Sequence, residues 1–384
     1  MLQNQRSAFS IPKDTTFLNC ANLSPLAKSV EEIGIKALLR KRNPGLITAD
    51  DFFTDADKLR KEYAKLINTT EDKRIVVIPS VSYGMANVVK NIPLKKGDEV
   101  IVAAEQFPSN YYPWAKRCEE TGANIKTIAP PDAIQRRGEK WNEKILEAIT
   151  PSVKVVALGN VHWADGTRFN LIAIRKRTRE VGAALIIDGT QSVGALPFDI
   201  QEIQPDALIC GGYKWLLGPY AIGLAYYGAM FDNGRPVEES WMNRMGSEDF
   251  RALVNYQSPY KSGSLRYEVG EHSNFVYVPM LMEAIRLLNK WKPSNIQKYC
   301  KSITSESISQ LRENGYWIED EDSRGYHLFG IRLPQHVDLD KVAARLRKNK
   351  VYVSFRGNAI RVAPNVYNTE RDLEKLTSLL LSKK

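Results

Sequence analysis

The sequence predicts an α/β protein in which a mostly parallel sheet is flanked by helices, with a smaller α+β domain towards the C-terminus. From about residue 50 to residue 230, amphipathic stretches alternate with short apolar runs, as in a sheet that carries helices on both faces. Several runs are apolar at consecutive positions, which is typical of strands buried on both sides. After about residue 250 the chain becomes loop-rich, and an αβ-type section follows. We therefore predict a large domain over residues 16–254 and a small domain over residues 255–384 that also recruits the arm 1–15.

The individual elements follow from these patterns in chain order. Residues 51–67 are predicted to form a helix because Phe53, Leu59, Tyr63 and Leu66 fall near one face. Apolar runs predict strands at residues 74–78, 99–103, 154–158, 184–187, 207–210 and 222–226. In the small domain the pattern predicts helices near 277–291 and 294–314, a strand over 328–333, a helix near 338–349, strands over 351–355 and 360–363, and a closing helix from about 369.

Composition argues against several classes of protein. The 384 residues, 43% of them hydrophobic, can bury a large core. No apolar run approaches the roughly 20 residues that span a bilayer, and the first residues lack the apolar stretch of a secretory signal. We therefore expect a cytoplasmic protein with no membrane partner. The four cysteines lie about 90 residues apart, without the paired spacing of a zinc site, so we expect no metal. The net charge of +10 comes from scattered lysines and arginines, so we expect no nucleic-acid partner.

The most informative residues are Asp188 and Lys214. An apolar strand ends at Asp188, and a second one, ending near Cys210, leads through two glycines and a tyrosine into Lys214. Ligands of open α/β sheets bind beyond the carboxyl ends of the strands, so both side chains can reach one ligand if the strands share a sheet. Pyridoxal 5′-phosphate (PLP) needs a lysine that forms an imine and a carboxylate that keeps its pyridine nitrogen protonated. Taken singly, the two residues fit a helix cap and a surface lysine; together with the glycines and Pro219 they favour PLP.

These residues belong to a wider resemblance. The sequence resembles the class V aminotransferases of PLP fold type I, a family that includes cysteine desulfurases, selenocysteine lyases, kynureninases and isopenicillin N epimerase-like proteins. The resemblance implies a large domain with a mostly parallel seven-stranded sheet flanked by helices, an amino acid as substrate, and a homodimer with its active sites near the subunit interface. The matching segments run in family order over residues 17–25, 105–109, 188–199, 212–223, 266–270 and 360–368.

The resemblance implies roles for residues around the cofactor ring. Asp188 would pair with the pyridine nitrogen, Gln191 would hydrogen-bond the ring O3′, and Lys214 would carry the cofactor and move the proton at Cα. Phe107 falls where the family stacks an aromatic ring or a histidine on the pyridine; a core aromatic is the alternative. Tyr213 resembles the kynureninase branch, in which a tyrosine at this position contacts the phosphate.

The phosphate is expected at Ser80, Val81 and Ser82, which follow the first apolar strand and precede a predicted helix. Backbone N–H groups at such an N-terminus, with the Ser82 hydroxyl, form an anion site. A plain N-cap serine is the competing interpretation.

The substrate side is expected around two arginines. Arg361 fits the family arginine that grips the substrate carboxylate, because a guanidinium matches a carboxylate bidentately. Arg356 is either the true ligand or a helper, and a solvated arginine is the alternative for both. Trp163, His162 and Asn22 fall at positions that would line the substrate side, although His162 also fits a hydrogen-bonded loop histidine.

Two phosphate contacts depart from the family pattern. The Gly-Thr that reaches the phosphate of the neighbouring subunit is replaced by Gly270–Glu271, and a glutamate cannot donate in the same way, so Ser273 or Asn274 would have to substitute. The serine often found three residues before the lysine is Gly211.

Other departures from the family pattern reduce the number of reactions that the sequence favours. Residues 320–360, where a desulfurase carries its thiolate, contain no cysteine, and Cys300 is expected to be buried in a helix, so a persulfide-forming desulfurase is disfavoured. Thr190 and Gln191 replace the acidic and histidine residues of kynureninase, which disfavours that enzyme.

We therefore predict a PLP-dependent, aminotransferase-like enzyme that acts at the Cα of an amino acid through a Schiff base on Lys214. A C–S or C–Se lyase or an epimerase is the enzymatic alternative, because these reactions share their first steps at Cα. A catalytically inactive homologue that only binds PLP is less favoured, since Asp188, Gln191, Lys214 and Arg361 are all present.

Overall fold

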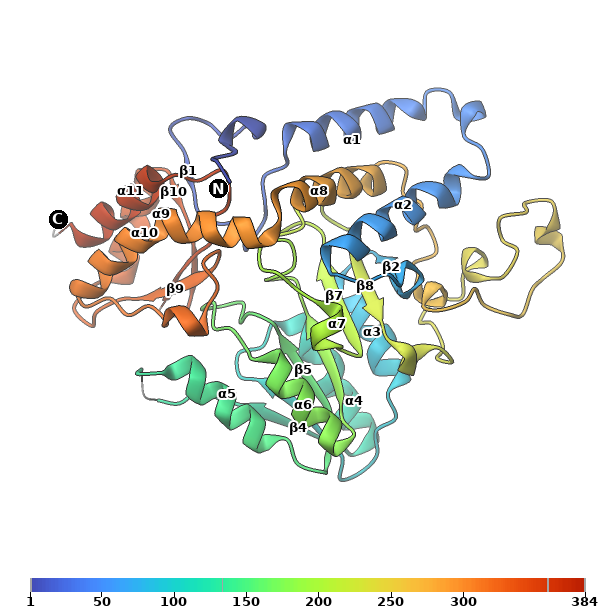
Figure 1. The fold of residues 1–384 in the computed structure, drawn as a ribbon, viewed down its shortest axis with the longest axis horizontal. Helices are drawn as coiled ribbons and strands as arrows, with labels where there is room; N and C mark the ends of the chain where they lie inside the picture. The colour runs from blue at the N-terminus through green and yellow to red at the C-terminus, as the bar shows by residue number, and fades with distance from the viewer. Residues whose placement is uncertain (1, 133, 358, 383–384) are drawn as a thin grey trace.

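A seven-stranded sheet runs through the centre of the molecule (Figure 1). The computed structural model describes residues 2–132, 134–357 and 359–382. The strands lie in the order β2-β8-β7-β6-β5-β3-β4, and only β8 runs antiparallel to its neighbours. The strands span Ile75–Ile78 (β2), Glu99–Ala103 (β3), Asn124–Ile128 (β4), Val153–Gly159 (β5), Ala184–Asp188 (β6), Ala207–Gly211 (β7) and Gly223–Tyr227 (β8). This confirms the predicted fold class of a mostly parallel sheet flanked by helices.

Helices cover both faces of this sheet. The apolar side chains of α3 and α4 share one core with one face, and those of α2, α5, α6, α7 and α8 share another core with the opposite face. Of the described helices, none combines the length and apolar composition needed to cross a membrane. The helices around the sheet span Lys28–Arg40 (α1), Asp51–Leu66 (α2), Val81–Asn91 (α3), Tyr112–Thr121 (α4), Arg137–Ala148 (α5), Leu171–Val181 (α6), Ile200–Ile203 (α7) and Tyr277–Trp291 (α8).

Burial on both faces explains why the central strands are apolar at consecutive positions. In β6, Leu185 and Ile187 enter one core, whereas Ala184 and Ile186 enter the other. All six apolar runs named above form strands of the sheet. The edge strand β4 was not predicted, because its sequence Asn-Ile-Lys-Thr-Ile is only partly apolar and its side chains are mostly exposed or half-buried.

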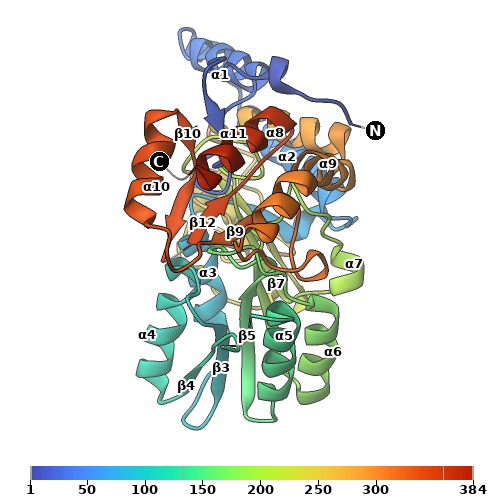
Figure 2. The ribbon, with the colours of Figure 1, turned by 90° about the vertical axis from the view of Figure 1, so that its left-hand side faces the viewer.

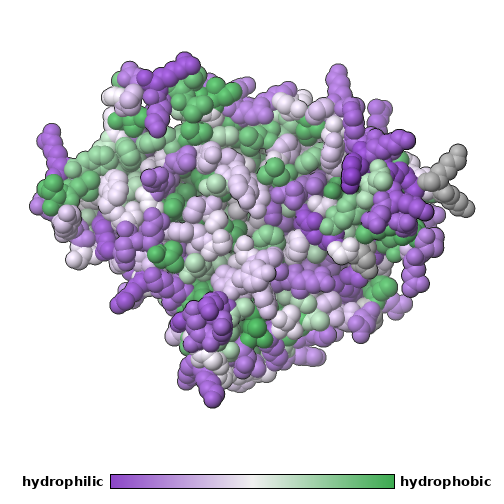
Figure 3. Space-filling view, turned by 180° about the vertical axis from the view of Figure 1, so that it is seen from behind, coloured by the Kyte–Doolittle hydropathy of each residue, from purple (hydrophilic) through white to green (hydrophobic). Residues whose placement is uncertain are grey.

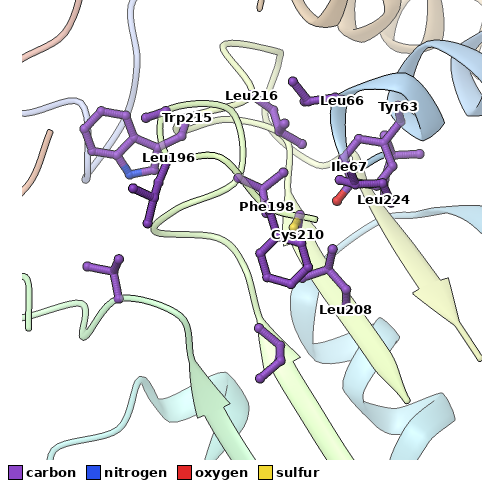
Figure 4. Close-up of a cluster of buried hydrophobic side chains, with 14 of the residues drawn as sticks. Tyr63, Leu66, Ile67, Leu196, Phe198, Leu208, Cys210, Trp215, Leu216 and Leu224 are labelled. Atoms are coloured by element: carbon purple, nitrogen blue, oxygen red, sulfur yellow. The ribbon is translucent and has the colours of Figure 1, made fainter. Parts of the chain in front are cut away.

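A dense apolar cluster anchors the segment that carries Lys214. Figure 4 shows Leu208 and Cys210 of β7 and Leu224 of β8 on the sheet, with Tyr63 and other side chains of α2 facing them. Trp215 and Leu216, directly after Lys214, belong to the same cluster. Both are about 1% exposed, so the residues after the lysine are fixed by packing.

The C-terminal part forms a second, smaller layer of strands and helices, seen in the upper half of Figure 2. Its antiparallel sheet has the order β11-β12-β9, and a parallel pair joins β1 to β10. A separate core, which includes Leu18 and residues from Tyr299 to Leu380, lies between these strands and three helices. The elements span Thr16–Phe17 (β1), Pro293–Glu313 (α9), Phe329–Arg332 (β9), Leu339–Lys348 (α10), Val351–Tyr352 (β10), Ser354–Arg356 (β11), Ala359–Val362 (β12) and Glu370–Leu381 (α11).

The predicted division into residues 16–254 and 255–384 stays a prediction, and the packing differs from it at two places. Helix α8 lies in the core of the seven-stranded sheet and packs against α1 and α2, because its apolar face covers that sheet. Strand β1, placed in the large domain by the prediction, pairs with β10 of the small sheet. The predicted strand over residues 351–355 is divided between β10 and β11, which belong to different sheets.

Candidate active site

A cavity of about 270 Å³ lies where the parallel strands of the large sheet end. Segments that follow β2, β3, β5, β6 and β7 form its wall, as expected for a ligand site of an open α/β sheet. The structure thus brings most of the predicted residues to one place. Those that line the cavity are Ser80, Val81, Ser82, Phe107, Trp163, Asp188, Gln191, Tyr213 and Lys214.

Asp188 and Lys214 enter this cavity from neighbouring strands. Asp188 is the last residue of β6, and its Oδ1 accepts the backbone N–H of Thr190 at 3.0 Å. Burial raises the pKa of Asp188, while the Thr190 hydrogen bonds and the charge of Lys214 act against that rise. Burial lowers the pKa of Lys214 to about 8, even though the negative charge of Asp188 acts in the opposite direction. Lys214 is therefore a lysine with a sizeable uncharged fraction near neutral pH.

Aromatic rings form the wall beside Lys214. The ring centroid of Phe107 lies 5.0 Å from the Lys214 Nζ, and that of Tyr213 lies 5.3 Å from it. Phe107 packs edge-on against Trp163 with a centroid distance of 5.4 Å. Phe107 is half-buried and faces the cavity, so it does not fill the core, which was the alternative. A flat aromatic ligand can stack in such a setting.

Gln191 lines the cavity, and both ends of its side-chain amide are held by hydrogen bonds. Its Nε2 donates to the carbonyl of Ala21 at 3.0 Å, and its Oε1 accepts the indole N–H of Trp215 at 2.9 Å. The amide nitrogen carries a second hydrogen, which is free to donate to a ligand.

The N-terminus of α3 forms the opposite end of the cavity. Ser80 caps this helix: its Oγ accepts the backbone N–H of Tyr83 at 3.2 Å and lies 3.0 Å from the Ser82 Oγ. Ser80 is therefore an N-cap residue, as the competing interpretation expected. The first N–H groups of a helix lack intrahelical acceptors, so those of Val81 and Ser82 can bind an anion at the positive end of the helix dipole. Together with a buried lysine, a strand-end carboxylate and an aromatic wall, this anion site fits PLP.

The two predicted arginines lie against Trp163, one of the lining residues. The Cζ atoms of Arg356 and Arg361 lie 5.1 Å and 5.9 Å from its ring centroid. Arg361 is buried, and its Nη1 donates to the carbonyl of Trp163 at 2.9 Å. Burial and the neighbouring charge of Arg356 lower the pKa of Arg361 to about 9. Arg361 is therefore not the solvated arginine of the alternative interpretation, whereas Arg356 is half-buried.

His162 and Asn22 lie outside the lining of the cavity. The Nδ1 of His162 is 3.1 Å from the Asp165 Oδ1, and its Nε2 is 3.1 Å from the carbonyl oxygen of Ala104. Both ring nitrogens are thus occupied, which matches the alternative of a hydrogen-bonded loop histidine. Asn22 is exposed, next to the Ala21 carbonyl that Gln191 binds.

Residues 162–168 connect the cavity wall to the small domain. The indole N–H of Trp163 donates to the carbonyl of Glu105 at 2.6 Å, which fixes the segment that carries Phe107. On the other side, the backbone N–H of Gly330 donates to the carbonyl of Asp165 at 2.8 Å. The same short segment therefore holds the aromatic wall and contacts the domain that carries Arg361.

Sequence reasoning did not assign several lining residues to the site, among them Thr190, Gln106 and Tyr220. Thr190 closes the turn after β6, where its Oγ1 accepts the backbone N–H of Gly211 at 3.2 Å; its position two residues after Asp188 was the available signal. Tyr220 packs against Tyr213 in a tilted arrangement with a centroid distance of 4.6 Å, and nothing in the sequence indicated that contact.

The segment that departs from the family pattern at the phosphate lies away from this cavity. Glu271 is exposed. Asn274, proposed as a substitute donor, uses its side-chain oxygen to accept the backbone N–H groups of Val276 and Tyr277 at 3.1 Å and 2.8 Å. Asn274 therefore caps the start of α8 with its oxygen, and both Ser273 and Asn274 stay candidates for the missing phosphate contact.

None of the four cysteines is an accessible thiol. Cys20, Cys118, Cys210 and Cys300 are all buried, and burial raises the pKa of each, that of Cys20 to about 12. A buried, protonated thiol is a poor nucleophile.

Comparisons with known proteins identify relatives along most of the chain. The protein is 26% identical over 315 residues to an uncharacterized aminotransferase, YcbU, of Bacillus subtilis, covering 82% of this chain and 80% of the relative. It is 27% identical over 356 residues to a probable cysteine desulfurase of Halalkalibacterium halodurans, covering 86% and 82%.

Two solved structures share the fold. The cysteine desulfurase CsdA of Escherichia coli matches with a TM-score of 0.82 at 19% identity, covering 97% of this chain and 96% of that chain. The cystine C-S lyase C-DES, solved with its product cysteine persulfide, matches with a TM-score of 0.85 at 16% identity, covering 96% and 97%.

A match to a protein-family model shows the family to which the protein belongs. The model described as aminotransferase class-V matches residues 47–376, which include every lining residue named above. The protein therefore belongs to the class V aminotransferase family, whose cofactor is PLP.

Proposed function

We propose that this protein is a PLP-dependent enzyme that acts at the Cα of an amino acid, with Lys214 as the residue that carries the cofactor. The observation that supports this most directly is the arrangement of Asp188 and Lys214 in one cavity, at the ends of adjacent parallel strands, with Phe107 beside the lysine. When bound, PLP supplies an electron-accepting ring that stabilises negative charge at the substrate Cα.

The residues of the cavity would share the work as follows. Asp188 would hold a proton at the pyridine nitrogen, and Phe107 would cover one face of the ring. The second N–H of the Gln191 amide would donate to the ring hydroxyl oxygen. Lys214, with a pKa of about 8, can take up and release a proton at Cα near neutral pH.

Two further regions would hold the charged ends of cofactor and substrate. Ser80, Val81 and Ser82 would hold the phosphate, and Tyr213 lines the same cavity. The substrate carboxylate binds Arg361, beside Trp163. His162 then supports the loop of Ala104 and does not contact the substrate.

Transfer of the amino group is our first candidate for the reaction, and C–S bond cleavage is the second. The burial of all four cysteines argues against a desulfurase that carries sulfur on its own thiol. It leaves room for a lyase that releases its sulfur product directly. C-DES, a cystine C-S lyase whose reaction product is cysteine persulfide, shares the fold of this chain.

An absorption spectrum between about 300 and 500 nm tests the cofactor proposal. We expect purified wild-type protein loaded with PLP to show the band of a lysine-bound cofactor, and Lys214→Ala to lack it. Lys290→Ala, which changes an exposed lysine of α8, is the control and should keep the band. A wild type that takes up no PLP would refute the proposal.

Product analysis then separates the two reactions. Each amino acid that changes the spectrum is incubated with the enzyme, with and without an α-keto acid. Return of the original spectrum only when the α-keto acid is added indicates amino transfer. Release of sulfide from cysteine or cystine without an α-keto acid indicates lyase chemistry.

We also propose a homodimer. Exposed large apolar side chains occur on α1 and on residues 241–256, among them Leu38, Trp241, Phe250 and Tyr256. In Figure 3, hydrophobic surface gathers in the upper left of the view, on the side of α1 and of the loop after β8. Patches of this kind mark protein contacts. We expect sedimentation as two chains for wild type and a shift towards one chain for Leu38→Glu; wild type sedimenting as one chain would contradict the proposal.

A further inference from the structure

The two arginines beside Trp163 lie next to each other on one face of the small sheet. In the register of β11 and β12, Ser354 pairs with Arg361, and Arg356 is two residues further along β11. Paired residues, and residues two apart on a strand, face the same side. Both guanidinium groups accordingly lie against the ring of Trp163. The sheet therefore presents two positive charges together beside the cavity.

Neither charge has an acidic partner. Among the ion pairs of the described residues, none involves Arg356 or Arg361, although the protein forms many such pairs elsewhere. The Nε atoms of both arginines are buried without a hydrogen-bond partner. Buried charges and buried donors without partners are destabilising, and adjacent like charges add to that cost. A bound anion would offset both charges and accept hydrogen bonds from these donors.

The cavity itself supplies only one carboxylate. Asp188 is the sole acidic side chain of its lining among the described residues, and it is assigned to the pyridine nitrogen. The α-carboxylate of an amino acid brings one negative charge to Arg361. One guanidinium then remains without an anion, unless the substrate brings a second acidic group.

The hydrogen bonds that Arg356 and Arg361 already make indicate that each arginine binds a different acidic group. Arg361 donates from Nη1 to the carbonyl of Trp163 and from Nη2 to the Ser354 Oγ at 3.3 Å. Arg356 donates from Nη1 to the carbonyl of Phe355 at 2.7 Å. Each guanidinium is thus held by its own partners and keeps its own free donors, including its Nε.

We propose that the substrate is an amino acid with an acidic side chain, and that Arg356 binds this second acidic group while Arg361 binds the α-carboxylate. This inference rests on the proposed function, because it specifies the substrate of the same site. Arg356 is accordingly a specificity-determining residue.

The test uses ligands that need no reaction. Binding of glutarate and succinate is measured by calorimetry on the PLP-loaded protein, with butyrate as the monocarboxylate that has the same number of carbons as succinate. We compare wild type, Arg356→Gln, Arg356→Lys and Arg371→Gln, the last of which changes an exposed arginine of α11. Circular dichroism verifies the folding of each variant.

A charge-assisted hydrogen bond contributes on the order of 1.5–3 kcal/mol, so we expect a dicarboxylate to bind wild type at least about tenfold more tightly than butyrate. Arg356→Gln should abolish this preference and leave butyrate binding unchanged. Arg356→Lys should keep part of it, and Arg371→Gln should keep all of it. Equal binding of butyrate and both dicarboxylates to wild type would overturn the proposal. So would a loss of butyrate affinity in Arg356→Gln, because both arginines would then share one carboxylate.

A spectral titration with two matched pairs, glutamate against glutamine and aspartate against asparagine, completes the test. We expect the acidic member of a pair to change the cofactor spectrum at a lower concentration, and this preference to be lost in Arg356→Gln. If the neutral member is preferred, the inference is wrong while the proposed function stands. If dicarboxylates bind through Arg356 but no amino acid changes the spectrum, acid recognition stands and the proposed function fails.

Discussion

The depressed pKa of Lys214 gives a prediction that can be worked out in numbers. Burial, together with the positive charges of Arg361 and Arg356, lowers this pKa from 10.5 to about 8, and the negative charge of Asp188 acts against the decrease. Only an uncharged amine attacks an aldehyde. The rate at which the PLP-free protein captures PLP covalently should therefore follow the titration of this one side chain.

The expected effect is large. With a pKa of about 8, about one tenth of Lys214 is uncharged at pH 7, and the fraction rises about tenfold by pH 9. For an ordinary lysine at 10.5, the uncharged fraction at pH 7 is smaller by a factor of 10 to the power 10.5 − 8, or about 300. Capture by the protein should therefore level off near pH 9, whereas a free lysine continues to gain reactivity beyond pH 10.

Stopped-flow absorbance of the PLP-free protein mixed with PLP measures this rate at each pH. The reaction of PLP with Nα-acetyl-lysine serves as the reference, because it contains the titration of PLP itself. Asp188→Asn removes the charge that raises the pKa, so its midpoint should move to lower pH. Arg361→Gln removes a positive charge, so its midpoint should move to higher pH. A wild-type midpoint near 10.5, or a shift of either variant in the opposite direction, would refute the electrostatic argument.

Three other substitutions test how the site is supported. Trp163→Phe removes the indole donor to the carbonyl of Glu105. We expect the free energy of unfolding, measured with urea, to fall by about 1 kcal/mol, and the circular dichroism of bound PLP to change. An unchanged cofactor spectrum would show that the loop does not depend on this hydrogen bond. Arg60→Met leaves the buried Glu268 without the guanidinium that pairs with it. The free energy of unfolding should fall by about 3–5 kcal/mol in the same assay. A fall below about 1 kcal/mol would contradict the importance of this ion pair. Gly194→Ala places a Cβ against a backbone carbonyl at a φ of +103°; we expect a large fall in melting temperature, and wild-type stability would contradict the close packing.

The sequence alone determined the fold class and nine of the residues that line the cavity. Strands buried on both faces must be apolar at consecutive positions, so they stand out in the sequence. The edge strand β4 has a mixed composition and was therefore missed. Asp188 and Lys214 were predictable because one apolar strand ends at Asp188 and another ends shortly before Lys214, and strand ends set where ligands bind.

Tertiary structure decided what depends on contacts between distant segments. The sequence could not place α8 against α2, because an amphipathic helix does not specify which apolar surface it covers. It also could not show that His162 is held between Asp165 and the carbonyl of Ala104, or that two arginines of the small sheet lie side by side against Trp163. Local patterns set the period and the ends of each element, whereas burial, pairing and pKa are set by residues far apart in the chain that folding brings together.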